Sequence, residues 1–184
     1  MDQTTLILIV LVAVAVIAAI VLLRRKRSEH LRSRFGPEYE HEVEHLGSRS
    51  KAEAELAKRE KRVEKLTIVP LEPAARAQFV ERWTDVQARF VDDPPRAVAF
   101  ADALLTEVMS ARGYPIADFD QRAGDISVDH PKVVEHYRAG HDIAVRHKRG
   151  KAGTEDLRQA MIHYRALFDE LVQEKEHAEV EPTH

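Results

Sequence analysis

The residues of this chain whose types and spacing most resemble a reaction site are His41, Glu42 and His45. They match the H-E-x-x-H pattern, in which two histidines one helical turn apart hold a zinc ion while the glutamate activates a water molecule. A catalytic zinc helix is normally walled by apolar residues, whereas this segment also carries Glu40 and Glu44. We therefore expect adventitious metal capture by the two histidines rather than catalysis.

A second pattern is a repeated tetrapeptide, His-Tyr-Arg-Ala, at 136–139 and 163–166. Tyr137 lies 13 residues before Gly150, and Tyr164 lies 13 residues after the lysine that follows this glycine. If the chain folds back here, the two tyrosines stand at one level of a helical hairpin and face each other. Their rings then bury a large apolar area, and each hydroxyl must find a partner or reach water.

The same count places His141 opposite Ala160, where a small residue leaves room for an imidazole. We therefore expect Tyr137, His141 and Tyr164 to form a polar seam, structural in the first place and a ligand site in the second. His136 does not extend the seam along its own helix, because five residues separate it from His141 and turn it away by about 140°.

No other pattern in the sequence carries recognisable chemistry. The absence of cysteine excludes disulfides, thiolate metal sites and a cysteine nucleophile. The sequence also lacks a glycine-rich phosphate loop and a GxSxG nucleophile elbow. We therefore predict no catalytic residue, no cofactor and no functional metal site, although a site assembled across the fold leaves no local signature.

The elements that must position these residues begin with an apolar segment. Every residue from Leu6 to Leu23 is Leu, Ile, Val or Ala. With the threonine before it, this run predicts a transmembrane helix over 5–23, because about 20 residues at about 1.5 Å each cross a hydrocarbon core of about 30 Å. A cleaved signal peptide fits less well, since Asp2 and not a basic residue precedes the run.

A basic cluster follows the apolar run and consists of Arg24, Arg25, Lys26 and Arg27. Basic residues beside a span stay on the cytoplasmic side, so we expect the C-terminal domain in the cytoplasm. The cluster is also a candidate contact for anionic membrane lipid, at about 1 kcal/mol per residue near the surface. A topology signal without lipid contact is the alternative.

The rest of the chain is expected to divide into a charged helical stem over 24–66, a bundle domain over 67–172 and a disordered acidic tail over 173–184. The stem has 13 basic and 9 acidic residues, a net charge of +4, and the chain after it has 15 and 21, a net charge of −6. The acidic part of the chain after the stem lacks the basic surface that nucleic-acid binding requires, so no nucleic-acid partner is expected.

Within the stem, Gly36-Pro37 and Gly47 predict breaks between successive helices. The segment from Lys51 to Leu66 has good helix formers but only a thin apolar stripe. We interpret it as a solvated spacer or a weak coiled coil.

Apolar residues recur at helical spacing on four segments of the predicted bundle domain. Their stripes include Phe79 and Trp83, Val98 and Leu105, Val134 and Tyr137, and Leu157 and Tyr164. A shorter segment around Phe119 predicts a bridging helix. The expected fold is therefore all-α, with a compact bundle of about four helices plus this short helix.

Several short segments serve as landmarks along the chain: Phe35-Gly36-Pro37-Glu38-Tyr39, Arg82-Trp83 with Gln87, Phe90-Val91-Asp92-Asp93-Pro94, Arg112-Gly113-Tyr114-Pro115, Asp129-His130-Pro131 and the segment 154–161. With them the chain resembles an uncharacterised family of bacterial single-pass membrane-anchored proteins with a helical C-terminal domain. The resemblance covers nearly the whole chain and implies the bacterial inner membrane. It implies no activity and assigns no binding residue.

These patterns favour a membrane-tethered, non-enzymatic helical interaction module, an adaptor or scaffold that binds a protein partner. The alternative is an enzyme or small-ligand receptor with a site between the bundle helices, near Tyr137, His141 and Tyr164. A third hypothesis is a sensor of lipid surfaces that works through the basic stem.

Overall fold

The computed structural model describes residues 3–173, without the side chains of 4–6 and 8–10. Within these residues the chain has eight helices and no strand, so the predicted all-α class is confirmed. Gln173 ends the last helix. The rest of the predicted acidic tail lies outside the described residues.

The chain divides into two compact units, residues 1–57 and residues 58–184. The first unit contains α1 (Gln3–Phe35), α2 (Pro37–Leu46) and most of α3 (Arg49–Val63). The predicted breaks are present: Gly36 separates α1 from α2, and Gly47 ends α2 with a positive φ of 60°. Proline at the first position of α2 has no N–H to lose there and presets the helical φ.

The expected membrane span requires a correction. Among the described residues, no helix is both long enough and apolar enough to cross a membrane. The predicted transmembrane helix over 5–23 and the single-pass location in a bacterial inner membrane are therefore overturned. The expected placement of the C-terminal domain in the cytoplasm rested on that span and is withdrawn with it.

The expected solvated spacer also requires a correction, because α3 is packed. Ala52 and Leu56 of this helix are fully buried. Beside them, the buried Tyr39 donates a hydrogen bond to Glu53 at 2.7 Å and accepts one from Arg49 at 2.9 Å. The buried apolar residues and these hydrogen bonds hold α2 against α3.

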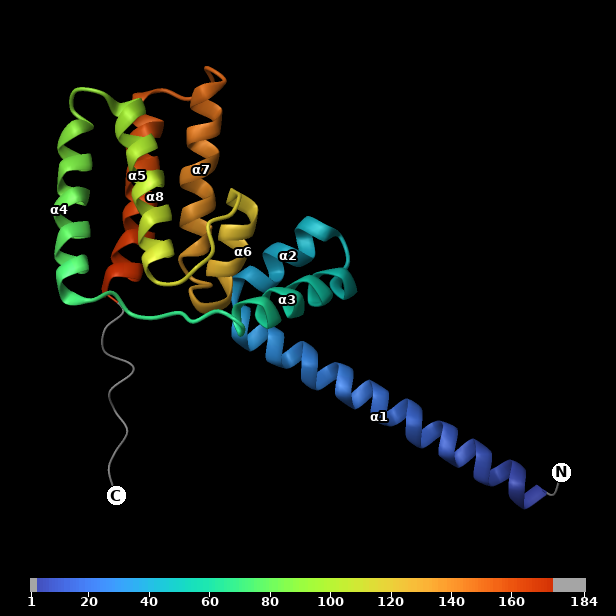
Figure 1. Ribbon diagram of the computed structural model, residues 1–184. Coiled ribbons are helices and arrows are strands. Elements are labelled where there is room, and N and C mark those ends of the chain that lie inside the picture. The colour runs from blue at the N-terminus through green and yellow to red at the C-terminus, as the bar shows by residue number, and fades with distance from the viewer. Residues whose placement is uncertain (1–2, 174–184) are drawn as a thin grey trace. The chain divides into compact units, whose positions relative to one another are not determined.

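The second unit contains α4 (Pro73–Arg89), α5 (Pro94–Ala111), α6 (Phe119–Asp129), α7 (Val134–Lys148) and α8 (Thr154–Gln173). In Figure 1, α5 and α8 lie in the middle, with α4 and α7 on either side, and α6 packs against α7. Buried apolar residues from all five helices form one core. We call this unit the bundle.

Local sequence explains where the bundle helices begin and end. Prolines start α4 and α5, and the carboxylates of Asp93 and Asp118 accept hydrogen bonds from the first-turn amides of α5 and α6. After α5, Gly113 has a φ of 102°, and a Cβ atom there would collide with the carbonyl of Thr67. Glycine is therefore required where the chain passes this carbonyl.

Arg112, which follows the last residue of α5, contacts both the segment that leads into the bundle and the last helix of the bundle. The amide of Val69 donates to the carbonyl of Arg112 at 2.9 Å. The buried Arg112 side chain donates to the carbonyls of Val69, at 3.4 Å, and of Leu171 in α8, at 3.2 Å. One guanidinium thus contacts both the segment that enters the bundle and the helix that leaves it.

Candidate functional site

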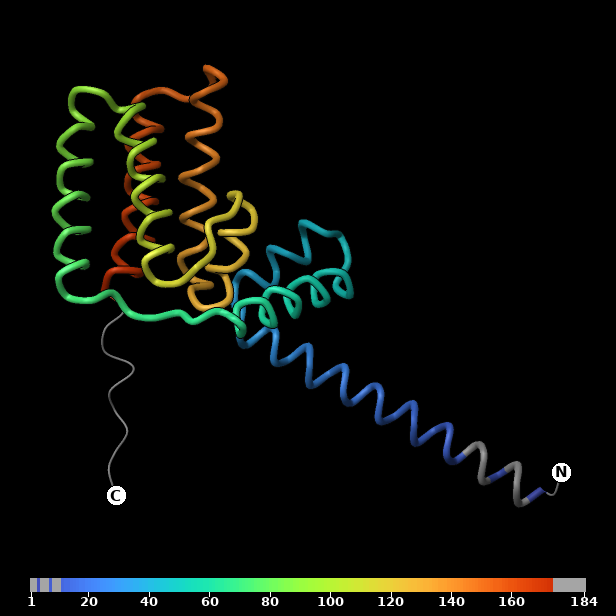
Figure 2. The backbone as a smooth tube through the Cα atoms, viewed as in Figure 1, coloured from blue at the N-terminus to red at the C-terminus, as the bar shows by residue number. Residues whose placement is uncertain are grey.

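The repeated tetrapeptide builds an aromatic contact between α7 and α8. Tyr137 and Tyr164 are fully buried, their ring centroids are 6.1 Å apart and their planes are inclined by 52°. The tube in Figure 2 shows the chain turning back between these two helices, which brings residues at equal distances from the turn to one level. The predicted meeting of the two rings is confirmed.

Gly140 makes room for this contact. A Cβ atom on Gly140 would lie 2.6 Å from Cε1 of Tyr164, closer than two carbon atoms can approach. A glycine inside a helix lowers stability by about 1 kcal/mol relative to alanine, yet here the missing side chain is the space that the ring occupies. Sequence reasoning missed Gly140, although its position three residues after Tyr137 places it on the same helical face.

The two tyrosine hydroxyls have different surroundings. Nε of Arg122 donates a hydrogen bond to the Tyr137 oxygen at 3.0 Å, and the same guanidinium lies 3.9 Å from the carboxylate of Asp102. The buried Tyr164 hydroxyl has no hydrogen-bond partner in the part of the chain that the structure describes. Burial, followed by the charge of Asp102, raises the pKa of Tyr137 to about 12 and raises the pKa of Tyr164 as well. Both phenols are therefore held in the neutral form.

His141 belongs to an aromatic stack beside the tyrosine pair. Its imidazole lies flat on Phe119 of α6, with ring centroids 3.6 Å apart and planes inclined by 9°. Phe119 also contacts Tyr137 at 4.8 Å and so links the imidazole to the pair. Burial lowers the pKa of His141, because the charged ring would lose hydration. The stacking partner is thus an aromatic residue that sequence reasoning had placed on the bridging helix and not in the seam.

The histidines of the repeat meet as well. Nδ1 of His136 and Nδ1 of His163 are 3.0 Å apart, and the ring centroids are 5.3 Å apart. The tyrosines and the histidines of the two copies therefore each meet across the hairpin, with the tyrosines inside the bundle and the histidines toward the surface. Sequence reasoning missed this pair because it compared histidines along one helix and not across the hairpin.

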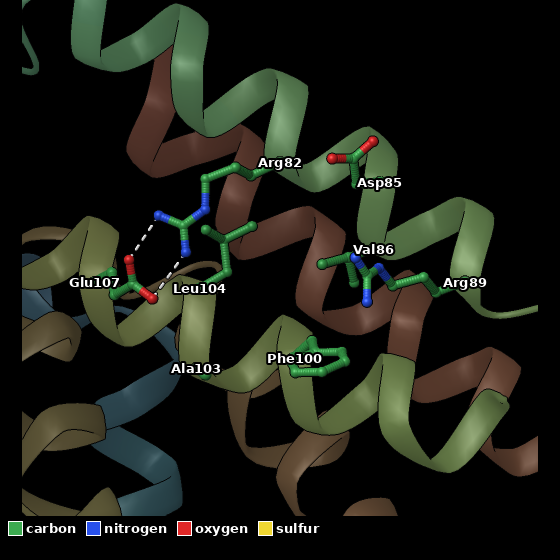
Figure 3. A pocket seen from close by; sticks show the side chains of 8 residues that line it. All are labelled: Arg82, Asp85, Val86, Arg89, Phe100, Ala103, Leu104 and Glu107. Carbon is green, nitrogen blue, oxygen red and sulfur yellow. Dashed lines mark hydrogen bonds and ion pairs between the residues drawn. The ribbon is translucent and has the colours of Figure 1, made fainter.

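A different kind of site lies between α4 and α5. It is a hollow of about 200 Å³, and Figure 3 shows that the side chains lining it come from both helices. Val86 and Leu104 are buried there, and Phe100 is 42 % exposed. The short side chain of Ala103 leaves the space between them open. We call this feature the α4–α5 groove; no sequence pattern predicted it.

Charged side chains form the rim of the α4–α5 groove (Figure 3). Arg82 donates two hydrogen bonds to the Glu107 carboxylate, at 2.6 and 2.8 Å, and these bonds lower the pKa of Glu107. The guanidinium carbon of Arg89 lies 5.4 Å from the ring centre of Phe100. Within residues 3–173 Arg89 has no carboxylate partner. The groove therefore offers one satisfied ion pair, the exposed carboxylate of Asp85 and the Arg89 cation, which is open to a ligand.

The other residues singled out from the sequence lie in the first unit. The exposed basic cluster on α1 consists of Arg24, Arg25, Lys26 and Arg27. Its contact with anionic lipid stays a prediction. The ring centroids of His41 and His45 are 6.3 Å apart in a stacked arrangement. Glu42, which lies between the two histidines in the sequence, is buried. In the described residues, no group of three or more His, Cys, Asp or Glu side chains is placed to hold a metal ion.

Comparison with known proteins assigns no family to this architecture. No family model matches the chain, and no curated protein or solved structure matches it. The family resemblance drawn from the sequence landmarks stays a prediction.

Proposed function

We propose that this protein is a non-enzymatic helical interaction module, an adaptor or scaffold, in which a bundle of four helices bridged by α6 binds a short segment of a partner protein. The observation that carries the proposal is the α4–α5 groove, where a half-exposed phenylalanine lies beneath an arginine without a carboxylate partner in the described residues.

The chemistry of the groove selects its occupant. An apolar side chain that fills the hollow covers Phe100 and contributes about 25 cal/mol per Å² of apolar surface removed from water. A carboxylate next to it pairs with Arg89, and partial burial by the peptide strengthens this charge-assisted hydrogen bond. The proposed ligand is therefore a peptide with an apolar anchor beside an aspartate or glutamate.

The rim supports binding because it is already fixed. The two hydrogen bonds between Arg82 and Glu107 hold both side chains in one geometry across α4 and α5. A preordered rim loses less side-chain entropy when a ligand arrives. An exposed ion pair of this kind adds only about 0.2 to 1 kcal/mol to folding, so its role in stability is small.

The aromatic seam supports the alternative, an enzyme or small-ligand receptor, less well. Tyr137 and Tyr164 are fully buried, and the ring of Tyr164 fills the space beside Gly140. The Tyr137 hydroxyl is already engaged by Arg122. These contacts favour a structural role for the seam.

The test is a screen of immobilised synthetic peptides against the full chain. The peptides vary an apolar residue and, next to it, an acidic, neutral or basic residue. We expect acidic-apolar peptides to bind, and we expect Phe100→Ala and Arg89→Glu each to lower the affinity about tenfold or more, equal to about 1.4 kcal/mol.

Matched controls lie on α8. Ile162 is 49 % exposed and Arg165 is also exposed, so Ile162→Ala and Arg165→Glu are an apolar truncation and a charge reversal outside the groove. They should leave peptide binding unchanged. Selection of basic peptides, or equal losses in the control variants, would show that the α4–α5 groove is not the binding site.

A further inference from the structure

The paired histidines of the repeat present two nitrogen atoms to one point on the surface of the bundle. Nδ1 of His136 on α7 and Nδ1 of His163 on α8 are 3.0 Å apart. Two imidazole nitrogens bound to one tetrahedral zinc ion, at about 2.0 to 2.1 Å each, lie about 3.3 Å apart. The observed spacing is thus within about 0.3 Å of the spacing that a shared metal ion requires.

The hydrogen bond between the rings shows where the lone pairs point. Such a contact needs a proton on one Nδ1 and a lone pair on the other, and both are directed into the same gap. Burial, followed by the nearby charge of His136, lowers the pKa of His163, which favours the neutral, metal-binding form. His136 is exposed, so the gap is open to ions from solvent.

We infer that His136 and His163 form a two-histidine site for a divalent transition-metal ion, with water in the remaining coordination positions. Imidazole ligands suit Zn²⁺, Cu²⁺ and Ni²⁺, whereas Mg²⁺ and Ca²⁺ prefer oxygen ligands. The metal replaces the shared proton and joins α7 to α8. Because the unfolded chain does not hold the two rings together, binding stabilises the folded bundle.

The experiment measures the denaturant midpoint of the full chain with and without Zn²⁺. Trp83 is the only tryptophan and stacks on Phe168 inside the bundle, so its fluorescence reports unfolding of this unit. We expect Zn²⁺ to raise the midpoint, Mg²⁺ to leave it unchanged, and His136→Gln or His163→Gln alone to remove the rise. Loss of either ligand of a chelating pair should lower the Zn²⁺ affinity on the order of tenfold or more.

A matched control is the histidine pair on α2. His41 and His45 lie one turn apart on α2 in the first unit, and the double variant His41→Gln/His45→Gln should keep the rise in the Trp83 midpoint. The inference is overturned if wild type shows no rise, if either single variant at His136 or His163 keeps it, or if the control loses it.

A second measurement needs no variant that could fold differently. In nitrogen NMR spectra of the wild-type chain, Zn²⁺ should shift the Nδ1 signals of two bundle imidazoles together and at one equivalent. A shift of a single imidazole, or shifts that never saturate, would contradict a shared site.

Discussion

The contact between α7 and α8 and the contact between α4 and α5 each contain a residue with little or no side chain, but only the first is filled. We call the α7–α8 contact the closed contact and the α4–α5 contact the open contact. In each, one helix presents a residue with little or no side chain, Gly140 in α7 and Ala103 in α5. The ring of Tyr164 enters the space at Gly140, whereas a hollow of about 200 Å³ remains beside Ala103. A small residue therefore closes a helix pair only where the opposite helix supplies a large side chain at the same level.

The largest expected effect comes from truncating the residue that fills the closed contact. Tyr164→Ala should lower the free energy of unfolding by about 3 to 5 kcal/mol, because it leaves a cavity in the core. Phe100→Ala in the open contact should lower it by less than about 1 kcal/mol, because its ring is already 42 % exposed. Urea denaturation followed by Trp83 fluorescence measures both. Similar losses for the two variants would break the distinction.

The next effect is a loss of stability at high pH that comes from the two tyrosines between α7 and α8. The folded chain holds the protons of Tyr137 and Tyr164 more tightly than the unfolded chain does. Their stabilising effect is therefore complete below the unfolded pKa of about 10 and falls as the pH rises toward 12. We expect a loss of about 2 to 3 kcal/mol at pH 11.

The double variant Tyr137→Phe/Tyr164→Phe should remove this alkaline loss, and Tyr39→Phe in the first unit should not. The difference is measured as the denaturant midpoint, followed by Trp83 fluorescence, at pH values from about 9 to about 12. These pKa values set that range. An unchanged alkaline loss in the double variant would place its origin outside the seam.

A smaller effect tests whether the space at Gly140 is truly occupied. Gly140→Ala should lower stability by about 1 to 2 kcal/mol, since collision with Tyr164 outweighs a gain in helix propensity of about 1 kcal/mol. Gly124→Ala in α6 is the matched control, because its new methyl group would first meet the ends of two flexible side chains, Arg59 at 3.3 Å and Arg62 at 3.6 Å, and no backbone or ring. Thermal unfolding should rank the control as neutral or stabilising.

The smallest effect separates the two hydroxyls of the seam. Tyr137→Phe should lower stability by about 1 kcal/mol, because Arg122 loses a hydrogen-bond acceptor in a largely buried position. Tyr164→Phe should change stability little or raise it slightly, because that hydroxyl has no partner within the described residues. Equal losses in urea denaturation would mean that the two hydroxyls are equivalent.

Much of the local structure could be predicted from the sequence. Prolines at Pro73 and Pro94 and the glycine at Gly47 mark helix ends by local backbone chemistry, which needs no tertiary information. The meeting of Tyr137 with Tyr164 could be found by counting from the turn, since a helical hairpin fixes which residues share a level.

The remaining features depend on how helices rotate and pack, which periodicity does not fix. Phe119 could be assigned to a short helix, but its stacking on His141 follows from the path of the loop before α6. The α4–α5 groove is a space that neighbouring side chains leave unfilled, and no single residue type in the sequence predicts such a space. The transmembrane prediction rested on one run of apolar residues, but no helix in the described part of the chain is both long enough and apolar enough to cross a membrane.

The contacts of Arg112 have a consequence for how this unit could be moved between proteins. Because one guanidinium binds the carbonyls of Val69 and Leu171, the chain enters and leaves the bundle at a single corner. Domains whose ends lie close together tolerate insertion into the surface loops of unrelated hosts. The segment between these residues is therefore a natural cassette for grafting, with both splice points anchored by a side chain that the cassette itself carries.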